Sequence, residues 1–201
     1  MKLLYMRDDI IVYIIIVLMC VLGIKMYMDS EAYNLVCVIS DVNGKKYCIR
    51  ERENVSRAAD KLARATMSMQ KLVDYSWKTY PDKECIKRLK SGFNPANISE
   101  TLPTSQFTAY SENKGEKLAF CLNNKKDSNK ELIDDNTLIF VAIHELSHIA
   151  TKSIGHDSEF WTNFKFLLKI AKEIGIYIPV DYSNSPQNYC GMVINDNPYY
   201  T

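Results

Sequence analysis

An unbroken apolar run near the amino terminus, IIVYIIIVLMCVLGI from Ile10 to Ile24, most constrains how this chain can fold. It has fifteen residues without a charge and no amphipathic period, so it suits neither a surface in water nor one face of a core helix. If Lys25 snorkels to the headgroups, Ile10–Met28 offers 19 residues, and about 17 to 25 are needed to cross a bilayer. We therefore predict a single-pass membrane anchor over residues 1–28.

Two other interpretations of the run remain open. A cleaved signal peptide would also begin with cations such as Lys2 and Arg7, although no small-residue cleavage site of the A-x-A kind follows the run. The other alternative is a buried core helix, which the lack of an amphipathic pattern disfavours.

The charges around the run bear on the side of the membrane that the domain occupies. Lys2, Arg7 and the amino terminus precede the run, and Lys25 is the one nearby cation after it. This asymmetry favours an amino terminus inside and a domain on the lumenal or external side. Two N-glycosylation triplets, Asn54-Val55-Ser56 and Asn97-Ile98-Ser99, are compatible with that side.

Residues 29–201 are expected to form one domain, because the chain has only 201 residues, of which 47% are hydrophobic and 24% charged. The net charge of +1 provides no basic field and argues against a nucleic-acid partner, and the cluster Lys83–Lys90 resembles a solvated helix face. The six cysteines contain no C-x-x-C pair, which does not support a cysteine zinc knuckle and leaves the redox compartment open.

The apolar periods predict an α+β domain in which antiparallel β-hairpins pack on a long helix. Asn43-Gly44 is a strong hairpin signal, Gly115 can supply the positive φ of a second turn, and no internal repeat interrupts the pattern. The expected elements are a hairpin within Val36–Glu51, a helix over Asn54–Thr79 ended by Pro81, a shorter helix through Arg88, an irregular stretch SGFNPANISETLPTS, strands at Gln106–Ser111 and Lys117–Leu122, a helix capped by Asp135 or Asn136, a helix capped by Asp157, and a loop-rich tail with one strand at Met192–Ile194.

All three histidines of the chain lie within eighteen residues, HELSHIATKSIGHDSEFW from His144 to Trp161. On a helix, His144 and His148 are one turn apart and can direct two imidazoles at one point. Gly155 permits a turn that brings His156 back as a third ligand. Three imidazoles around Zn²⁺ leave one tetrahedral position for water, which is typical of a catalytic site.

Glu145 follows the first ligand and emerges about 100° around the helix, so its carboxylate can reach a water at that position without ligating the metal. Zinc suits neutral imidazoles with an open position, although iron or nickel would also fit these ligands. The alternative is that the histidines are structural residues of a buried helix, since a bare H-E-x-x-H also arises by chance. The use of the entire histidine content in one segment favours the metal site.

The same segment resembles the active-site region of the WLM and SprT-like zinc metallopeptidases, which are zincins. In these enzymes H-E-x-x-H is followed by a loop, a third His and an aromatic-rich helix, and Gly155, His156, Asp157, Phe160 and Trp161 match that second half. The anchor and the stretches FNPANISET and YSENKGEKLAFCLN resemble membrane-anchored members of this group in large DNA viruses. The resemblance implies a zincin-like fold with His144, His148 and His156 as zinc ligands, Glu145 as general base, and a peptide or protein substrate.

The resemblance has limits. The spacing after His148 does not fit the metzincin pattern, so Met192 is interpreted as a core residue. The DNA-linked members act on DNA–protein crosslinks, a substrate that a membrane anchor and a neutral domain do not favour. A catalytically inactive, zinc-stabilised interaction module at a membrane is the alternative function, and a helical adaptor without metal is a third.

Several supporting roles stay open between chemistry and structure. Tyr182 and Tyr189 could donate to the oxyanion, but packing is the favoured role for both. Asp157 could orient His156, although a cap of the following helix is favoured. By the resemblance, one strand of the Gln106–Leu122 hairpin could bind an extended peptide by strand addition.

Overall fold

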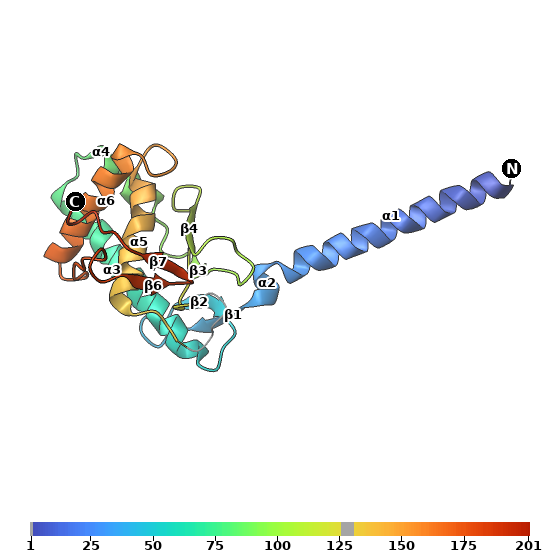
Figure 1. Ribbon diagram of the computed structural model, residues 1–201, viewed down its shortest axis with the longest axis horizontal. Helices are drawn as coiled ribbons and strands as arrows, with labels where there is room; N and C mark the ends of the chain where they lie inside the picture. Colours follow the sequence, from blue (N-terminus) through green and yellow to red (C-terminus); the bar gives the residue numbers. More distant parts are fainter. Residues whose placement is uncertain (1, 126–130) are drawn as a thin grey trace.

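A computed structural model describes residues 2–125 and 131–201 (Figure 1). Helix α1 (Lys2–Met28) projects from the remainder of the chain, which packs into one body. The other helices are α2 (Glu31–Asn34), α3 (Val55–Thr79), α4 (Glu84–Gly92), α5 (Asp135–Ala150) and α6 (Ser158–Glu173). The strands are β1 (Leu35–Ile39), β2 (Lys46–Arg50), β3 (Ile98–Glu100), β4 (Ala109–Glu112), β5 (Lys117–Phe120), β6 (Gln187–Tyr189) and β7 (Met192–Ile194).

The segment Ile10–Met28 of α1 is long and apolar enough to cross a membrane, and none of it is buried against the rest of the chain. The interpretation of this run as a buried core helix is therefore wrong. The side chains of Lys2 and Arg7, on which the expected orientation depends, lie outside the described part of the molecule.

Five strands form a mixed sheet in the order β1-β2-β3-β5-β4. Two antiparallel hairpins, β1–β2 and β4–β5, form its two sides, as predicted. Strand β3 joins them by parallel pairing with β2 and with β5. The α+β class is thus confirmed, but the sheet is not made of antiparallel hairpins alone. Strand β4 is left at an edge of the sheet.

Two strands were missed in the sequence. Strand β3 lies in the stretch expected to be irregular, because its three residues between Pro95 and Pro103 are too few for a visible period. Strand β6 pairs with β7 through a tight turn in which Cys190 and Gly191 both have positive φ. Such turns are usually marked by Asn-Gly or Asp-Gly, and Cys-Gly gives no comparable signal.

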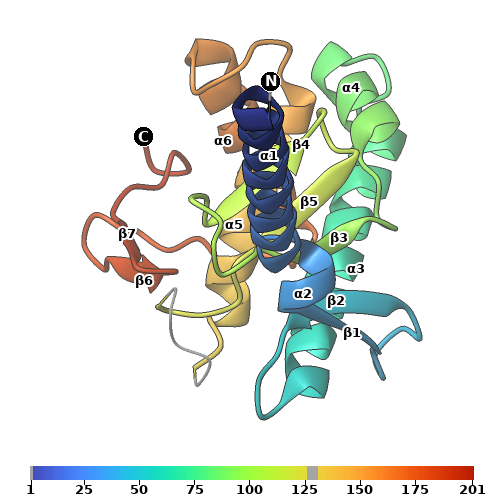
Figure 2. The ribbon, with the colours of Figure 1, turned by 90° about the vertical axis from the view of Figure 1, so that its right-hand side faces the viewer.

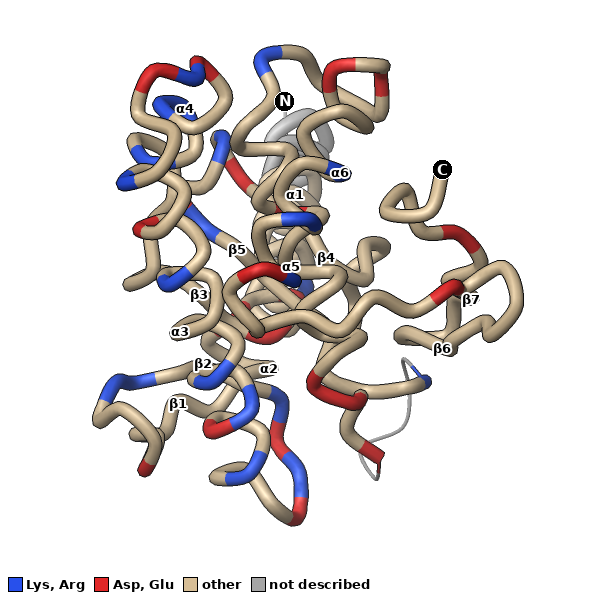
Figure 3. Tube along the Cα trace, turned by 90° about the vertical axis from the view of Figure 1, so that its left-hand side faces the viewer, with Lys and Arg blue, Asp and Glu red and all other residues tan. Residues whose placement is uncertain are grey.

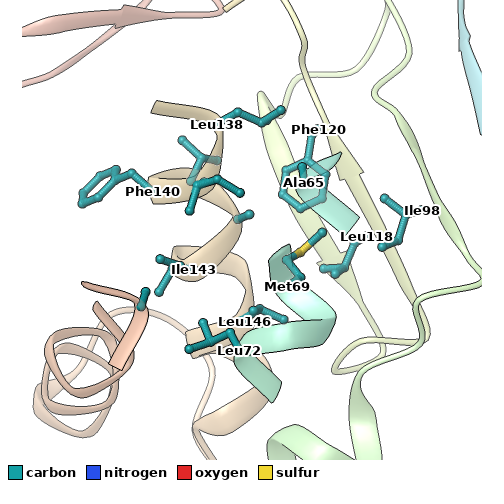
Figure 4. Packing of buried hydrophobic residues seen from close by; sticks show 14 of the residues in the cluster. Ala65, Met69, Leu72, Ile98, Leu118, Phe120, Leu138, Phe140, Ile143 and Leu146 are labelled. Carbon is teal, nitrogen blue, oxygen red and sulfur yellow. The ribbon is translucent and has the colours of Figure 1, made fainter. Parts of the chain in front are cut away.

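The main core lies between the sheet and the helices α3 and α5, with α4 and α6 on the flanks of α5 (Figures 1 and 2). Figure 4 shows Leu146 of α5 beside Leu72 of α3, and Met69 of α3 beside Leu118 of β5. Asp157 caps α6 by accepting from the third residue ahead, as expected, and Asn54 caps α3 in the same way. Asp134 caps α5 in place of the expected Asp135 or Asn136. Lys, Arg, Asp and Glu are interspersed over the face in Figure 3.

Two disulfide bonds cross-link the domain, Cys37 to Cys48 and Cys121 to Cys190. The first joins the strands of the β1–β2 hairpin, and the second joins the segment after β5 to the turn between β6 and β7. Backbone bonds from Cys190 N to Asn123 O (3.0 Å) and from Gly191 N to Asn124 O (3.0 Å) support the second link. The β6–β7 hairpin is therefore fastened beside β5.

The turn between β4 and β5 fixes the distance from the edge strand to α5. Gly115 has φ +106°, and an added Cβ would lie 2.5 Å from Gly92 O and 2.7 Å from Ile149 Cδ1. Glycine is needed here for its conformation and also for the close approach of α4 and α5.

We expect Gly115→Ala to lower the free energy of unfolding by about 3 kcal/mol, because an unfavourable φ and a steric clash act together. Gly44→Ala is the matched control, since Gly44 has φ +68° with nothing within 4 Å of its Cβ position, and it should cost only about 1 kcal/mol. Urea unfolding of the full chain in detergent measures both. Equal losses would contradict the packing role of Gly115.

Candidate metal centre

His144 and His148 lie where the buried helix α5 opens to solvent. From Thr137 to Ala150 every residue is buried except these two, which are half-buried. They lie on one face of the helix, as the four-residue spacing predicts, and their Nε2 atoms are 3.2 Å apart. Most of the other buried residues of α5 are apolar, and the helix packs against α3, α4 and α6.

The segment after α5 returns His156 to the same point. The helix ends at Ala150, and Gly155 lies in the following loop with φ +94°, where it allows the expected turn. The Nε2 atom of His156 is 3.1 Å from that of His144 and 3.1 Å from that of His148. The three nitrogens form a nearly equilateral triangle.

This triangle fits a tetrahedral zinc ion. Three nitrogens bound at about 2.0–2.1 Å with tetrahedral angles would lie ~3.3–3.4 Å from one another, close to the observed separations. All three nitrogens lie within 4.8 Å of each other and could hold a metal ion. Without a cation, lone pairs would face each other, because one triangle of imidazole nitrogens cannot satisfy all its members by hydrogen bonds.

Burial keeps two of the rings ready to ligate. It lowers the pKa of His144 to about 3, and the neighbouring His148 and His156 add to the effect. Burial likewise lowers the pKa of His148 to about 4, with contributions from His156 and the Lys114 ammonium. Both imidazoles are therefore neutral near pH 7 and offer a free lone pair to a metal.

An aromatic side chain of α6 forms the floor behind the histidines. The ring centroid of Phe160 lies 4.9 Å from His144, 4.4 Å from His148 and 4.6 Å from His156. Phe160 has no exposed surface, and its contact with all three rings restricts their orientations. Trp161 adds a tilted contact with His156 at 5.7 Å. These are two of the aromatic positions on which the resemblance was based.

Asp157 acts as the cap of α6. Its Oδ1 accepts from Phe160 N at 2.9 Å, and its Oδ2 accepts from Ser153 Oγ at 2.6 Å. The favoured interpretation of this residue is confirmed. By capping α6 and holding Ser153, it also shapes the loop that carries His156.

Glu145 is 5% exposed and, with His144, borders two cavities. One has a volume of about 280 Å³ between α5, Trp161 and the β6–β7 hairpin. The other, about 590 Å³, lies between α5, strand β4 and the loop that bears His156. Burial raises the pKa of Glu145 to about 8, and a dication beside it would act in the opposite direction.

We predict that Glu145 makes the stability of the metal-free chain depend on pH. The pKa of Glu145 is raised from 4.5 to about 8. Its contribution to the free energy of unfolding is therefore fully present below pH 4.5 and is lost as the pH rises through 8. Metal-free Glu145→Gln should be more stable than the metal-free parent at about pH 9, by roughly a few kcal/mol, and equal to it at about pH 4.

Urea unfolding in detergent with a chelator, repeated across this pH range, measures the difference. Glu53→Gln makes the same chemical change at an exposed position and should follow the parent at every pH. A difference that does not depend on pH would contradict the burial of an ionisable Glu145.

Lys114 is a supporting residue that sequence reasoning missed. From the β4–β5 turn its Nζ donates to three carbonyl oxygens: His148 O (3.0 Å), Thr151 O (2.8 Å) and Ser153 O (2.6 Å). A cation at the carboxyl end of α5 also interacts favourably with the helix dipole. Lys114 therefore ties His148 to the loop that carries His156. A lysine in a turn gives no sequence signal for such a role.

Arg88 of α4 also binds the end of α5. Its Nε donates to Ala150 O at 2.7 Å, and its Nη2 pairs with Glu159 of α6 at 2.6 Å. The end of α5 and the start of α6 are thus joined through one guanidinium. Together, Lys114 and Arg88 hold the two ends of the loop between the second and third histidine.

We expect Lys114→Met to weaken zinc binding by about tenfold or more, because residues that orient metal ligands typically contribute that much. Lys152→Met is the matched control: it removes the same charge at an exposed position in the loop that carries His156. Competition with a zinc-selective chelator measures both affinities. Equal affinities in the two variants would contradict the positioning role of Lys114.

The two candidate tyrosines differ in their position. Tyr182 is fully buried against Phe140, at 4.9 Å between ring centroids, away from the cavities. Tyr189 is also buried, but it borders the smaller cavity with Glu145, and its hydroxyl donates to Thr108 O at 3.2 Å. Burial is the main cause that raises the pKa of Tyr189, and the nearby Glu145 carboxylate adds to it. The phenol therefore stays protonated. Of the two, only Tyr189 lies near the histidines.

Met192 is not a core residue, and its interpretation as core is wrong. It is 47% exposed and borders the smaller cavity beside Val193, with its Sδ 3.3 Å from Thr108 Oγ1. The β6–β7 hairpin places it there, and this hairpin was only half recognised in the sequence.

Comparison with known proteins finds viral relatives. The chain is 29% identical over 164 residues to an uncharacterized protein of Acanthamoeba polyphaga mimivirus, covering 80% of this chain and 82% of that protein. It is 36% identical over 70 residues to an uncharacterized protein of Invertebrate iridescent virus 6, and 40% identical over 65 residues to one of Invertebrate iridescent virus 3. Each of these shorter matches covers 38% of the relative.

No family model matches the chain, and no solved structure matches it. The names of the relatives state no activity. The likeness to zincin metallopeptidases therefore rests on the residues of this chain and their geometry.

Proposed function

We propose that this protein is a membrane-anchored, zinc-dependent metallopeptidase with a zincin-like fold. The observation that carries the proposal is the triangle of His144, His148 and His156 nitrogens, with Glu145 next to it at the junction of two cavities. Three neutral imidazoles form a ligand set that leaves one zinc position open, as in catalytic sites.

A zinc ion held there would supply Lewis acidity to a substrate carbonyl and lower the pKa of a bound water toward ~7. Glu145 then accepts a proton from the attacking water and returns it to the leaving amine. Its buried position suits a general base, because an apolar environment raises the affinity of its carboxylate for a proton. Tyr189, held protonated by burial, is the better placed of the two candidate donors to an oxyanion.

The edge strand β4 supports an extended peptide as substrate. It pairs with β5 on one side only, and Ala109, Tyr110 and Ser111 border the larger cavity together with the three histidines. A peptide added to this edge by strand addition would run past the metal centre. Its backbone would gain hydrogen bonds from β4, and its side chains would alternate between the cavity and solvent.

The oxidising side of a membrane is the compartment that the domain suits. Two disulfide bonds are characteristic of lumenal or external proteins, and both asparagines of the glycosylation triplets, Asn54 and Asn97, are exposed. With Ile10–Met28 as a retained anchor, these observations favour an amino terminus inside and a domain outside.

The alternative function is a zinc-stabilised interaction module without turnover. Such a module needs only the ligands, whereas this chain also places a buried carboxylate and two cavities beside them. A buried carboxylate without a catalytic role would lower stability near neutral pH and confer nothing in return. The arrangement therefore favours catalysis.

We predict that Glu145→Gln retains one zinc per chain and loses peptide hydrolysis by at least about a hundredfold, because general acid–base catalysis contributes about that much. Metal analysis and cleavage of a broad peptide library by the full chain in detergent measure the two properties. Glu53→Gln should leave both properties unchanged.

His148→Ala should lose both zinc and hydrolysis, which separates loss of the metal from loss of the base. If the zinc-loaded parent cleaves no peptide, the inactive module is favoured. If Glu145→Gln cleaves as fast as the parent, the general-base role is wrong.

A further inference from the structure

The connection between α1 and the domain is short and folded. Only residues 29–34 separate the end of α1 from the start of β1. Ser30 Oγ donates to Tyr27 O at 2.6 Å, and Asn34 Nδ2 donates to Met28 O at 2.6 Å and to Ser30 O at 2.9 Å. The rings of Tyr27 and Tyr33 also meet at 5.5 Å. The chain therefore has no flexible linker at this junction.

Helix α2 is also attached to the sheet. Its Glu31 forms an ion pair with Lys117, the first residue of β5. Immediately after α2, Leu35 begins β1, which is buried at this residue, paired with β2 and cross-linked by the Cys37–Cys48 disulfide. A segment that leaves the membrane at Met28 is thus part of the folded sheet seven residues later.

The attachment point lies at one end of the edge strand β4. Lys117, which binds α2, is the register partner of Glu112, the last residue of β4. In Figures 1 and 2, α1 joins the domain at α2, which lies beside the β1–β2 hairpin. The larger cavity follows β4 from Tyr110 and Ser111 toward the histidines. One end of this cavity is therefore close to the point where the chain enters the membrane.

Exposed apolar side chains border the same larger cavity. Phe107, two residues before β4, is 54% exposed, and its ring centroid lies 6.1 Å from that of Tyr110. Ile154, in the loop that carries His156, is 94% exposed and borders the same cavity. Segments that follow or precede a transmembrane helix are often rich in apolar and aromatic residues. The exposed side chains of Phe107 and Ile154 could bind such residues.

We infer that the substrates are extended juxtamembrane segments of other proteins anchored in the same membrane. This inference rests on the proposed peptidase function and adds the class of substrate. A six-residue connection spans at most about 20 Å even when fully extended, and it is folded here, so the site stays close to the bilayer surface. A substrate in the same membrane also meets the site at a high effective concentration.

The test uses the full chain, loaded with zinc, in vesicles of phosphatidylcholine with some phosphatidylglycerol. A peptide sequence that the chain cleaves in detergent is fused to a single-pass helix, either directly beside the bilayer or beyond a forty-residue helical spacer of about 60 Å. The same spacer is inserted between Met28 and Asp29 in a second form of the enzyme. Both soluble parts must lie outside the vesicle, which added trypsin verifies.

The parent should cleave the near sequence at least about tenfold faster than the far sequence, and the enzyme with the spacer should show the reverse preference. Both enzymes should cleave the free peptide in detergent at the same rate, which shows that the spacer leaves the site folded. Equal cleavage of near and far sequences by the parent would overturn the inference while the peptidase function stands. Failure of the parent to cleave any free peptide in detergent would overturn the proposed function, and the inference with it.

Discussion

The convergence of three imidazole nitrogens at one point is the constraint on which this structure depends. Their separations of 3.1 to 3.2 Å suit three ligands of one cation, whereas hydrogen bonds among three imidazole nitrogens cannot satisfy all of them at once. The domain holds two of the rings on α5, a helix that is otherwise buried from Thr137 to Ala150. The packing of this helix therefore restricts where the two imidazoles can lie.

The surrounding structure serves to keep this geometry. Phe160 restricts all three rings, and Lys114 and Arg88 hold the loop between the second and third ligand through backbone carbonyls. Gly115 lets the β4–β5 turn approach α5, so the edge strand lies beside the site. The Cys121–Cys190 disulfide fastens the β6–β7 hairpin that closes the other side.

Much of the fold and of the candidate site could be predicted from the sequence, because the patterns that indicate them lie within short stretches of the chain. The grouping of the three histidines, the helix that bears two of them, the Asp157 cap and the two main hairpins all follow from spacing, capping and turn residues within short windows. Strand β3 could not be recognised, because its three residues are strands only through parallel pairing with distant β2 and β5. The role of Lys114, the exposure of Met192 and the disulfide pairing also depend on tertiary contacts, which no local pattern encodes.

X-ray absorption spectroscopy at the zinc edge of the metal-loaded chain tests the central claim most directly. The proposed function predicts one zinc per chain with three imidazole nitrogens at about 2.0–2.1 Å and a fourth, light ligand from solvent. A shell that contains sulfur at about 2.3 Å, fewer than three imidazoles, or no stoichiometric zinc at all would contradict a metal centre built by His144, His148 and His156.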